Sequence, residues 1–261
     1  MTVNPDGLQQ SFAQTYDPPN DLDPLELREE YQQFTEYRAA NPHAGRVKTA
    51  NALNIPTGRA RSWIDGAQPD VVKGLTAAEN RNWFATDGQP HQALTRLVAG
   101  IFAAGSINDT WTPRWSATDG TGFDEALQTI DAGVTRINRN SNQHGDELEP
   151  ARDPQVLGRV LYARGAPNTH VSEYELPAYL FDHHQTGRTF VQTYVNARGV
   201  VPEGRNHIQV YEQQRSDTFH DRLHQLIDQH TTGEVTRVEQ GVLIHPSTVE
   251  HTSWLHNEAE P

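Results

Sequence analysis

Four polar side chains within residues 57–62 have the types and the spacing that recognition of duplex DNA requires. They are Thr57, Arg59, Arg61 and Ser62. Arginine can form paired hydrogen bonds to guanine or to phosphate, and a hydroxyl group can reach either a base or the backbone. Ala60 and Trp63, three residues apart, predict a helix that turns these two side chains toward a core. The polar side chains would then lie on or near its outward face, able to enter the major groove.

The residues before this segment complete the pattern of a helix-turn-helix. A first helix is expected over 46–53, and a second over 57–65, where Gly66 closes it. Asn54 lies between them and tolerates the left-handed backbone that a tight turn needs. Ala50 stands where the first helix touches the second and only a small side chain fits. The alternative is an ordinary three-helix bundle whose arginines are simply solvated.

Positive charge is concentrated in the same region. Arg46 and Lys48 belong to a stretch, residues 44–75, with five cations and two acids, whereas the whole chain has 21 Lys and Arg against 34 Asp and Glu and a net charge of −13. A basic segment on an acidic chain favours a binding role for that segment. Its partner is expected to be double-stranded DNA, with an acidic protein partner as the alternative.

The composition excludes several classes of protein. The chain has no Cys, which rules out disulfide scaffolds and Cys-ligated metal sites. It has no run of about 18 apolar residues, and residues 1–23 lack the basic and apolar parts of a signal peptide, so we expect a cytoplasmic protein without a membrane segment. Acid-rich, Lys-poor, Cys-free composition resembles that of proteins from salt-loving archaea.

The remaining segments predict two further parts. Residues 1–24, rich in Pro and Asp, predict a mobile tail, residues 25–75 a helix-turn-helix domain that starts with a helix over 25–40, and residues 76–89 a linker. Beyond residue 90, helices are expected over 91–104, from 123 with Val134 and Ile137 on its apolar face, over 172–184, over 217–230 and near 248–256. Strands are expected within 107–117 and over 156–162, 188–196, 207–212, 235–238 and 242–245, with a loop over 138–154. This order indicates two repeats, about 90–167 and 168–257.

Two expected helices carry a family resemblance. The run 97–107 has a face of small residues at Ala99, Gly100, Ala103 and Ala104, and the run 176–184 offers a second helix at the corresponding place. Together they resemble the LAGLIDADG homing-endonuclease fold over about residues 90–257. The resemblance implies an α+β protein, an all-α helix-turn-helix domain followed by a pseudo-symmetric αββαββ repeat domain, with two crossing central helices and a saddle of strands on DNA.

The resemblance also shows where this chain departs from the family. Active members end each motif helix with Asp or Glu before Gly, and these acids hold a divalent metal near the scissile phosphate. Here that position falls on Ala104, or on Gly105 one residue later, and on His183 or His184 in the second helix. We therefore expect no catalytic residues, no metal ligands and no cofactor.

The saddle that the resemblance implies could still contact DNA. Arg188, Gln192, Tyr194 and Asn196 alternate along the expected strand 188–196, so they would point the same way. They could then contact phosphates or base edges. A polar, solvated face of an antiparallel sheet is the alternative.

The sequence thus predicts a sequence-specific DNA-binding protein, a transcriptional regulator similar to LAGLIDADG-derived regulators that have lost nuclease activity. One alternative is a homing endonuclease that uses magnesium and unorthodox acids, such as Asp182 with Asp109 or Asp119. Another is a protein-interaction scaffold. A homodimer or a protein partner stays open, because a lone helix-turn-helix usually benefits from a partner. His220 and His224, four apart on an expected helix, could ligate zinc but are more simply an ordinary helical pair.

Overall fold

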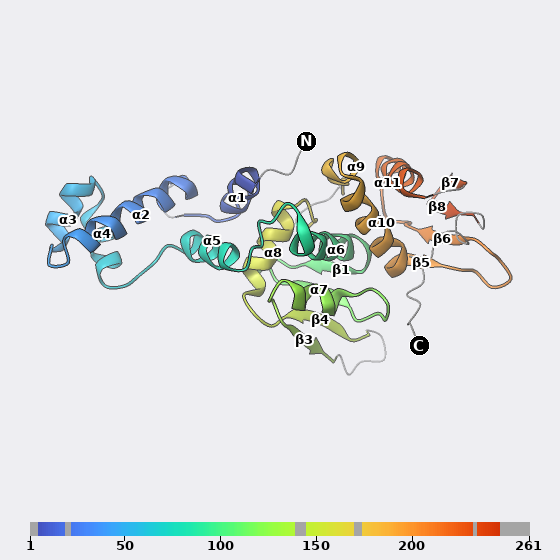
Figure 1. Cartoon of the computed structure of the whole chain (residues 1–261), viewed down its shortest axis with the longest axis horizontal. Coiled ribbons are helices and arrows are strands. Elements are labelled where there is room, and N and C mark those ends of the chain that lie inside the picture. Colours follow the sequence, from blue (N-terminus) through green and yellow to red (C-terminus); the bar gives the residue numbers. More distant parts are fainter. Residues whose placement is uncertain (1–4, 19–21, 139–144, 170–173, 232–233, 246–261) are drawn as a thin grey trace.

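The structure, a computed structural model, describes residues 5–18, 22–138, 145–169, 174–231 and 234–245 of a mixed α+β protein (Figure 1). The first helices are α1 (Pro5–Ala13), α2 (Pro24–Ala40), α3 (Arg46–Leu53), α4 (Thr57–Ile64) and α5 (Asp70–Asn80). Then follow α6 (Gly88–Ala104), β1 (Gly105–Ile107), β2 (Pro113–Ser116), α7 (Phe123–Thr129), β3 (Val134–Ile137), β4 (Glu147–Pro150) and α8 (Pro154–Ala163). The last elements are α9 (Tyr179–Asp182), α10 (His184–Arg198), β5 (Gly199–Val200), β6 (Ile208–Tyr211), α11 (Asp217–His230), β7 (Val235–Val238) and β8 (Gly241–Ile244).

Helices α2, α3 and α4 pack around a small aromatic core. Asp23 caps α2, because its Oδ1 accepts a hydrogen bond from the backbone N–H of Leu25 at 2.7 Å. The ring of Trp63 on α4 lies edge-on to Tyr31 and Phe34 of α2, with centroids 5.2 and 5.3 Å apart. The three helices form where the sequence predicts them, over 25–40, 46–53 and 57–65.

The turn between α3 and α4 depends on Asn54. This residue has φ 54° and ψ 40°, and its backbone N–H donates to the carbonyl of Ala50 at the end of α3. The backbone N–H of Ile55 donates to the same carbonyl at 3.1 Å. Ala50 and Ile55 are both buried, so packing of these side chains stabilises the turn in addition to its backbone hydrogen bonds.

The N-terminal segment is not a tail, so the prediction for residues 1–24 is wrong where the structure describes them. Helix α1 packs against α5 and α8. Phe12 is fully buried, with its ring 5.4 Å from that of Phe84. Leu8 and Phe12 lie four residues apart and form an apolar stripe on one face of α1. The Pro and Asp residues around them dominate the composition of the segment, so composition alone does not predict this packed helix.

The prediction of a linker over 76–89 is also wrong. Helix α5 extends to Asn80, and Leu75 and Ala78 are buried on its inner face. Trp83 follows directly, is fully buried, and donates from its indole N–H to the carbonyl of Ile130 at 2.8 Å. This segment is therefore part of the core rather than a spacer.

From α6 onward the chain contains one arrangement twice. The sheets have the strand orders β1-β2-β4-β3 and β5-β6-β8-β7, and all their pairings are antiparallel. Each sheet follows a long helix, α6 or α10, and these two helices pack against each other (Figure 1). One row of paired residues in the first sheet is Gly105, Trp115, Leu148 and Arg136, and the matching row in the second is Gly199, Val210, Val242 and Arg237.

The core lies between these sheets and their helices. Trp115 and Val210 are fully buried on the covered faces of the two sheets. A Cβ at Gly100 of α6 would lie 2.5 Å from Phe123 and 2.6 Å from Trp115. Gly100 therefore makes room for aromatic rings of the first repeat. The sequence predicts instead that the small residues of this helix allow close approach of the second helix.

The second repeat begins later than the sequence suggests. The expected strand 188–196 is part of α10, the expected strand 156–162 is α8, and the expected helix 172–184 is reduced in the described residues to α9. Helix α10 is rich in Thr and Val, which favour strands on propensity, but packing decides the state of a helix buried on several sides.

The remaining helices and strands differ less from the prediction. The expected loop 138–154 contains β4, and Val134 and Ile137 belong to β3 rather than to the apolar face of a helix. The helices at 91–104 and 217–230 and the strands at 207–212, 235–238 and 242–245 form as predicted, within one to three residues at their ends. The helix expected near 248–256 lies outside the described residues.

Candidate nucleic-acid interface

Five of the expected contact residues are exposed on two consecutive helices. They are Arg46, Lys48, Thr57, Arg61 and Ser62, which we call the α3–α4 surface. The Arg61 side chain is 65 % exposed, and its Nε lies 3.6 Å from Oδ2 of the equally exposed Asp65. An ion pair of this kind contributes little to stability, so the guanidinium can exchange it for another anion at small cost.

The beginnings of α3 and α4 lack a side-chain cap. Their N-cap residues are Gly45 and Pro56, neither of which has a side chain that could accept a hydrogen bond from the first turn. The first N–H groups of a helix have no partner within the helix. A Cβ at Gly58 in the first turn of α4 would meet no atom within 4 Å. Nothing in the described chain therefore requires glycine there, and the helix start is open to an approaching group.

Arg59 does not belong to the exposed set, and this part of the prediction is wrong. Its guanidinium forms an ion pair with Glu30 of α2 and lies 5.9 Å from the centre of the Trp63 ring. Its side chain is only 15 % exposed. Arg59 precedes Trp63 by four residues, so the two side chains share one helix face, and the sequence spacing already contained this signal.

The second expected set of contacts does not form a common face. Arg188, Gln192, Tyr194 and Asn196 lie on helix α10, where alternate residues point in different directions. Arg188 is exposed, and Gln192 and Asn196 line a small cleft of about 70 Å³ beside α6. Tyr194 is fully buried, and its hydroxyl donates to Oε1 of Glu212. A strand face that reads DNA is therefore excluded for this segment.

A buried charge cluster surrounds Glu212, and the sequence pattern does not predict it. Its carboxylate is 3 % exposed and accepts a hydrogen bond from Nε of Arg198 at 2.9 Å, while Nε of Arg215 lies 3.7 Å away. Burial, and then the nearby Glu212 carboxylate, raise the pKa of Tyr194 well above its ordinary value. Tyr194 and Arg198 are four residues apart, a signal that becomes visible only once α10 is recognised as a helix.

The open faces of the two sheets differ in chemistry. On the first sheet, Arg114 donates from Nε to Glu149 at 2.8 Å and lies 3.9 Å from Glu147, so one cation faces two carboxylates. On the second sheet, the open face carries Val200 and Tyr211, which are 62 % and 42 % exposed. Among the residues that the structure describes, neither face has the excess of cations that phosphate contacts require.

The two histidines considered as zinc ligands make ordinary structural hydrogen bonds. Nε2 of His220 lies 2.8 Å from the carbonyl oxygen of Glu212, and Nε2 of His224 lies 3.1 Å from that of Val235. In the part of the chain that the structure describes, no three His, Asp or Glu side chains are grouped closely enough to hold a metal ion.

Neither a scan against protein-family models nor a search of curated proteins finds a match for this chain. Within the described residues, no helix combines the length and the apolar character needed to cross a membrane.

Proposed function

We propose that the protein binds duplex DNA through the α3–α4 surface, with α4 as the helix that enters the major groove. The proposal rests on three exposed cations, Arg46 and Lys48 in the first turn of α3 and Arg61 in the last turn of α4, and on two helix starts that have no side-chain cap. The partial positive charge of a helix start and the cationic side chains both attract phosphate. The short turn of residues 54–56, with Asn54 in the left-handed conformation, supports the proposal, because the two helices of a helix-turn-helix are joined by a turn of three or four residues.

In this proposal Arg59 positions α4 instead of contacting DNA. Its ion pair with Glu30 and its contact with Trp63 join α4 to α2. The contacts then come from Arg61, Thr57 and Ser62 on α4, and from Arg46 and Lys48 at the start of α3.

We propose further that the repeats from α6 onward form a LAGLIDADG-like domain that does not cut DNA. The proposal is supported by two sheets of equal strand order and by the packing of α6 against α10. With the helices matched at Gly105 and Gly199, the positions where active members carry an acid hold Ala104 and Arg198. This assignment replaces His183 and His184 by Arg198, which makes a pair of metal-binding carboxylates there impossible. The regulator is favoured over an endonuclease with acids at these positions. The alternative with Asp182 and Asp109 or Asp119 has no support either, because in the described residues no three His, Asp or Glu side chains are grouped closely enough to hold a metal ion.

The open sheet faces favour protein interaction over DNA contact for this domain. Arg114 is held by two carboxylates, and the second sheet exposes Val200 and Tyr211. In the described part of both sheets, the first face carries more negative than positive charge and the second presents an apolar surface, so neither face attracts phosphate. We therefore assign DNA binding to the α3–α4 surface and the role of an interaction platform to the repeats.

The test begins with selection of a binding site from random duplexes by the full-length protein. The triple variant Arg46→Ala, Lys48→Ala, Arg61→Ala is then compared with the wild type by gel shift over a range of salt concentrations. A phosphate contact contributes to the salt slope, and a base contact is worth about 1–3 kcal/mol, so affinity should fall by roughly tenfold or more. The salt slope should also become shallower.

The matched control is the triple variant Arg136→Ala, Arg152→Ala, Arg205→Ala, which removes three exposed cations from the repeats. It should leave both the affinity and the salt slope unchanged. Equal losses in the triple variant and the control would show that only general charge matters. Failure of the wild type to enrich any sequence, together with capture of a stable protein partner, would favour the scaffold alternative.

A further inference from the structure

An acid borders the α3–α4 surface, next to one of its cations. Asp65 directly follows the last residue of α4, and its side chain is 66 % exposed. Its Oδ2 lies 3.6 Å from Nε of Arg61, one helical turn earlier. Side chains on a helix lean toward its N-terminal end, so the Asp65 carboxylate lies over the turn that presents Arg61. A group that binds this guanidinium therefore also meets a negative charge.

Helix α4 does not require this carboxylate for its own stability. The backbone N–H of Asp65 closes the helix, because it donates to the carbonyl of Arg61 at 2.9 Å. An acid at the end of a helix meets the negative end of the helix dipole. In ion pairs four residues apart, the more stabilising order has the acid first, whereas here the cation comes first. Helix stability therefore gives no reason for Asp rather than Asn at this position.

The other two cations of the surface have no acidic neighbour of this kind. Among the residues that the structure describes, neither Arg46 nor Lys48 forms an ion pair with Asp or Glu. Both lie in the first turn of α3, where the helix dipole also attracts an anion. Arg46 and Lys48 are therefore suited to phosphate contacts, which contribute affinity but carry no sequence information.

The Asp65 carboxylate restricts what Arg61 can bind. Losing the exposed ion pair costs little, but the carboxylate stays close to any group that the guanidinium then contacts. A phosphate there would be repelled, and the repulsion grows where DNA displaces water. The edge of guanine is uncharged, and its O6 and N7 accept two hydrogen bonds from one arginine. With Nε next to Asp65, the two Nη groups of Arg61 remain available for these two acceptors.

We infer that Asp65 is a positioning residue that directs Arg61 to guanine instead of phosphate. The inference rests on the proposed binding of DNA by the α3–α4 surface, and it names the base that this surface recognises. The carboxylate lowers the general attraction of the surface to DNA and increases the difference between the correct base and the others. Affinity then comes mainly from Arg46 and Lys48, and sequence preference from Arg61.

The first experiment replaces single guanines in the duplex that the wild type selects. 7-Deazaguanine lacks the N7 acceptor, whereas inosine keeps both N7 and O6 and is the matched control. At the guanine that Arg61 contacts, 7-deazaguanine should weaken binding of the wild type by about fivefold or more, and inosine should not. The same replacement should have no effect on Arg61→Ala, which has already lost the contact. A selected site in which no guanine behaves in this way would overturn the inference.

The second experiment compares Asp65→Asn with the wild type by gel shift. Asn keeps the backbone cap and the size of the side chain but removes the charge. On an unrelated duplex, binding should become roughly threefold tighter and the salt slope steeper, because Arg61 is then able to contact phosphate. The preference for guanine over adenine at the Arg61 contact should fall by about fivefold. An unchanged preference would show that Asp65 does not position Arg61.

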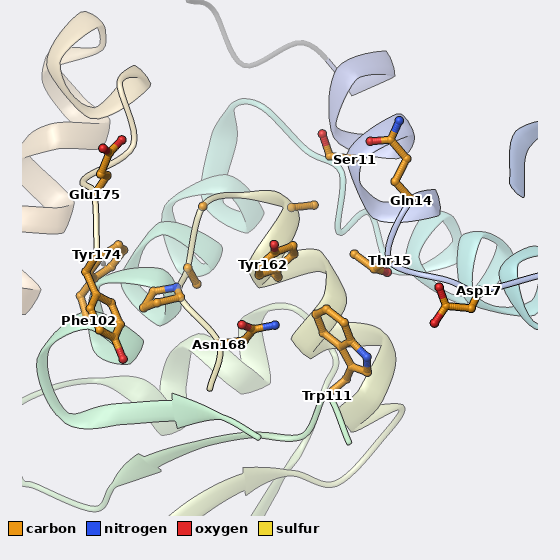
Figure 2. A pocket seen from close by; sticks show the side chains of 14 residues that line it. Ser11, Gln14, Thr15, Asp17, Phe102, Trp111, Tyr162, Asn168, Tyr174 and Glu175 are labelled. Atoms are coloured by element: carbon orange, nitrogen blue, oxygen red, sulfur yellow. The ribbon is translucent and has the colours of Figure 1, made fainter. Parts of the chain in front are cut away.

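The matched control for charge is Glu175→Gln. Glu175 is exposed in the wall of a cavity between α1 and the repeats (Figure 2), and the α3–α4 surface contributes no residue to this wall. This variant also removes one negative charge from a chain of net charge −13, and it should change neither the salt slope nor the base preference. Equal changes in both variants would assign the effect to net charge and overturn the inference. If the wild type selects no sequence, the proposed function fails together with the inference, whereas a selected site without the guanine contact overturns the inference alone.

Discussion

The guanidinium of Arg164 donates a hydrogen bond from Nη1 to Nδ1 of His91 across 3.3 Å. Nε2 of the same imidazole lies 3.0 Å from Oγ1 of Thr186 on α10, so one neutral ring connects α6 to both α8 and α10. Arg164 also donates to the carbonyl of Trp83 at 3.0 Å. This network holds the segment after α5 against the packed helices of both repeats.

The hydrogen-bond network around His91 makes the free energy of unfolding depend on pH. Burial, and then the charge of Arg164, lower the pKa of His91 from 6.5 to about 4. Below pH 6.5 the unfolded chain protonates this histidine while the folded protein does not, so the contribution to stability is complete above pH 6.5 and is lost as pH falls toward 4. The pKa difference corresponds to at most about 3 kcal/mol. Urea unfolding of the wild type and of His91→Gln should show a steeper loss of stability for the wild type between pH 6.5 and 4. Parallel curves would contradict this assignment.

Arg59 is expected to act on the fold of the three-helix unit. Arg59→Met removes the ion pair with Glu30 but keeps the stem that lies near Trp63. Since the pair is partly exposed, the free energy of unfolding should fall by about 1 kcal/mol or less. A double-mutant cycle with Glu30→Gln measures the coupling, and gel shifts should show an unchanged salt slope. A slope as shallow as that of a phosphate-contact variant would mean that Arg59 touches DNA after all.

Substitution of Glu212 should lower the free energy of unfolding far more than substitution of Arg59. Glu212→Gln removes a buried negative charge and leaves the guanidinium groups of Arg198 and Arg215 without it. Removing one partner of a fully buried pair costs about 3–5 kcal/mol, and we expect the lower end here because the side chains of Arg198 and Arg215 are 44 % and 17 % exposed. Tyr194→Phe, which removes a single hydrogen bond to the same carboxylate, should cost about 1–3 kcal/mol. Thermal unfolding of the two variants tests the order, and a milder effect from Glu212→Gln would show that the carboxylate is not the centre of the cluster.

The sequence was most informative where local chemistry determines an element. The cap at Asp23, the left-handed residue Asn54 and the small, buried Ala50 specify α2, α3 and α4 without reference to distant residues. These three helices are therefore predicted nearly to the residue. The side chains that α3 and α4 expose follow from the same periodicity, apart from Arg59.

The sequence was least informative where burial on several sides removes the pattern of one apolar face. Helix α10 buries Thr186, Phe190, Thr193 and Tyr194 among others, and its Thr and Val residues resemble those of a strand. Interpreting this segment as a strand places the start of the second repeat too early and makes Tyr194 an expected DNA contact. The order of the strands, which reveals the repeat, depends on pairings between distant residues that no local spacing encodes.

Two helical glycines, Gly158 and Gly58, differ in whether their surroundings leave room for a side chain. A Cβ at Gly158 would lie 1.9 Å from the carbonyl oxygen of Trp111, so Gly158→Ala should destabilise the protein strongly. A Cβ at Gly58 would meet nothing within 4 Å, and because Gly58 is in a helix, Gly58→Ala should raise the free energy of unfolding by about 0.5–1 kcal/mol. If DNA approaches the start of α4 closely, the same Gly58→Ala variant should bind the selected duplex more weakly although it is more stable. Thermal unfolding and gel shifts on one preparation test both halves. A stabilised variant with unchanged affinity would move the DNA contact away from this helix start.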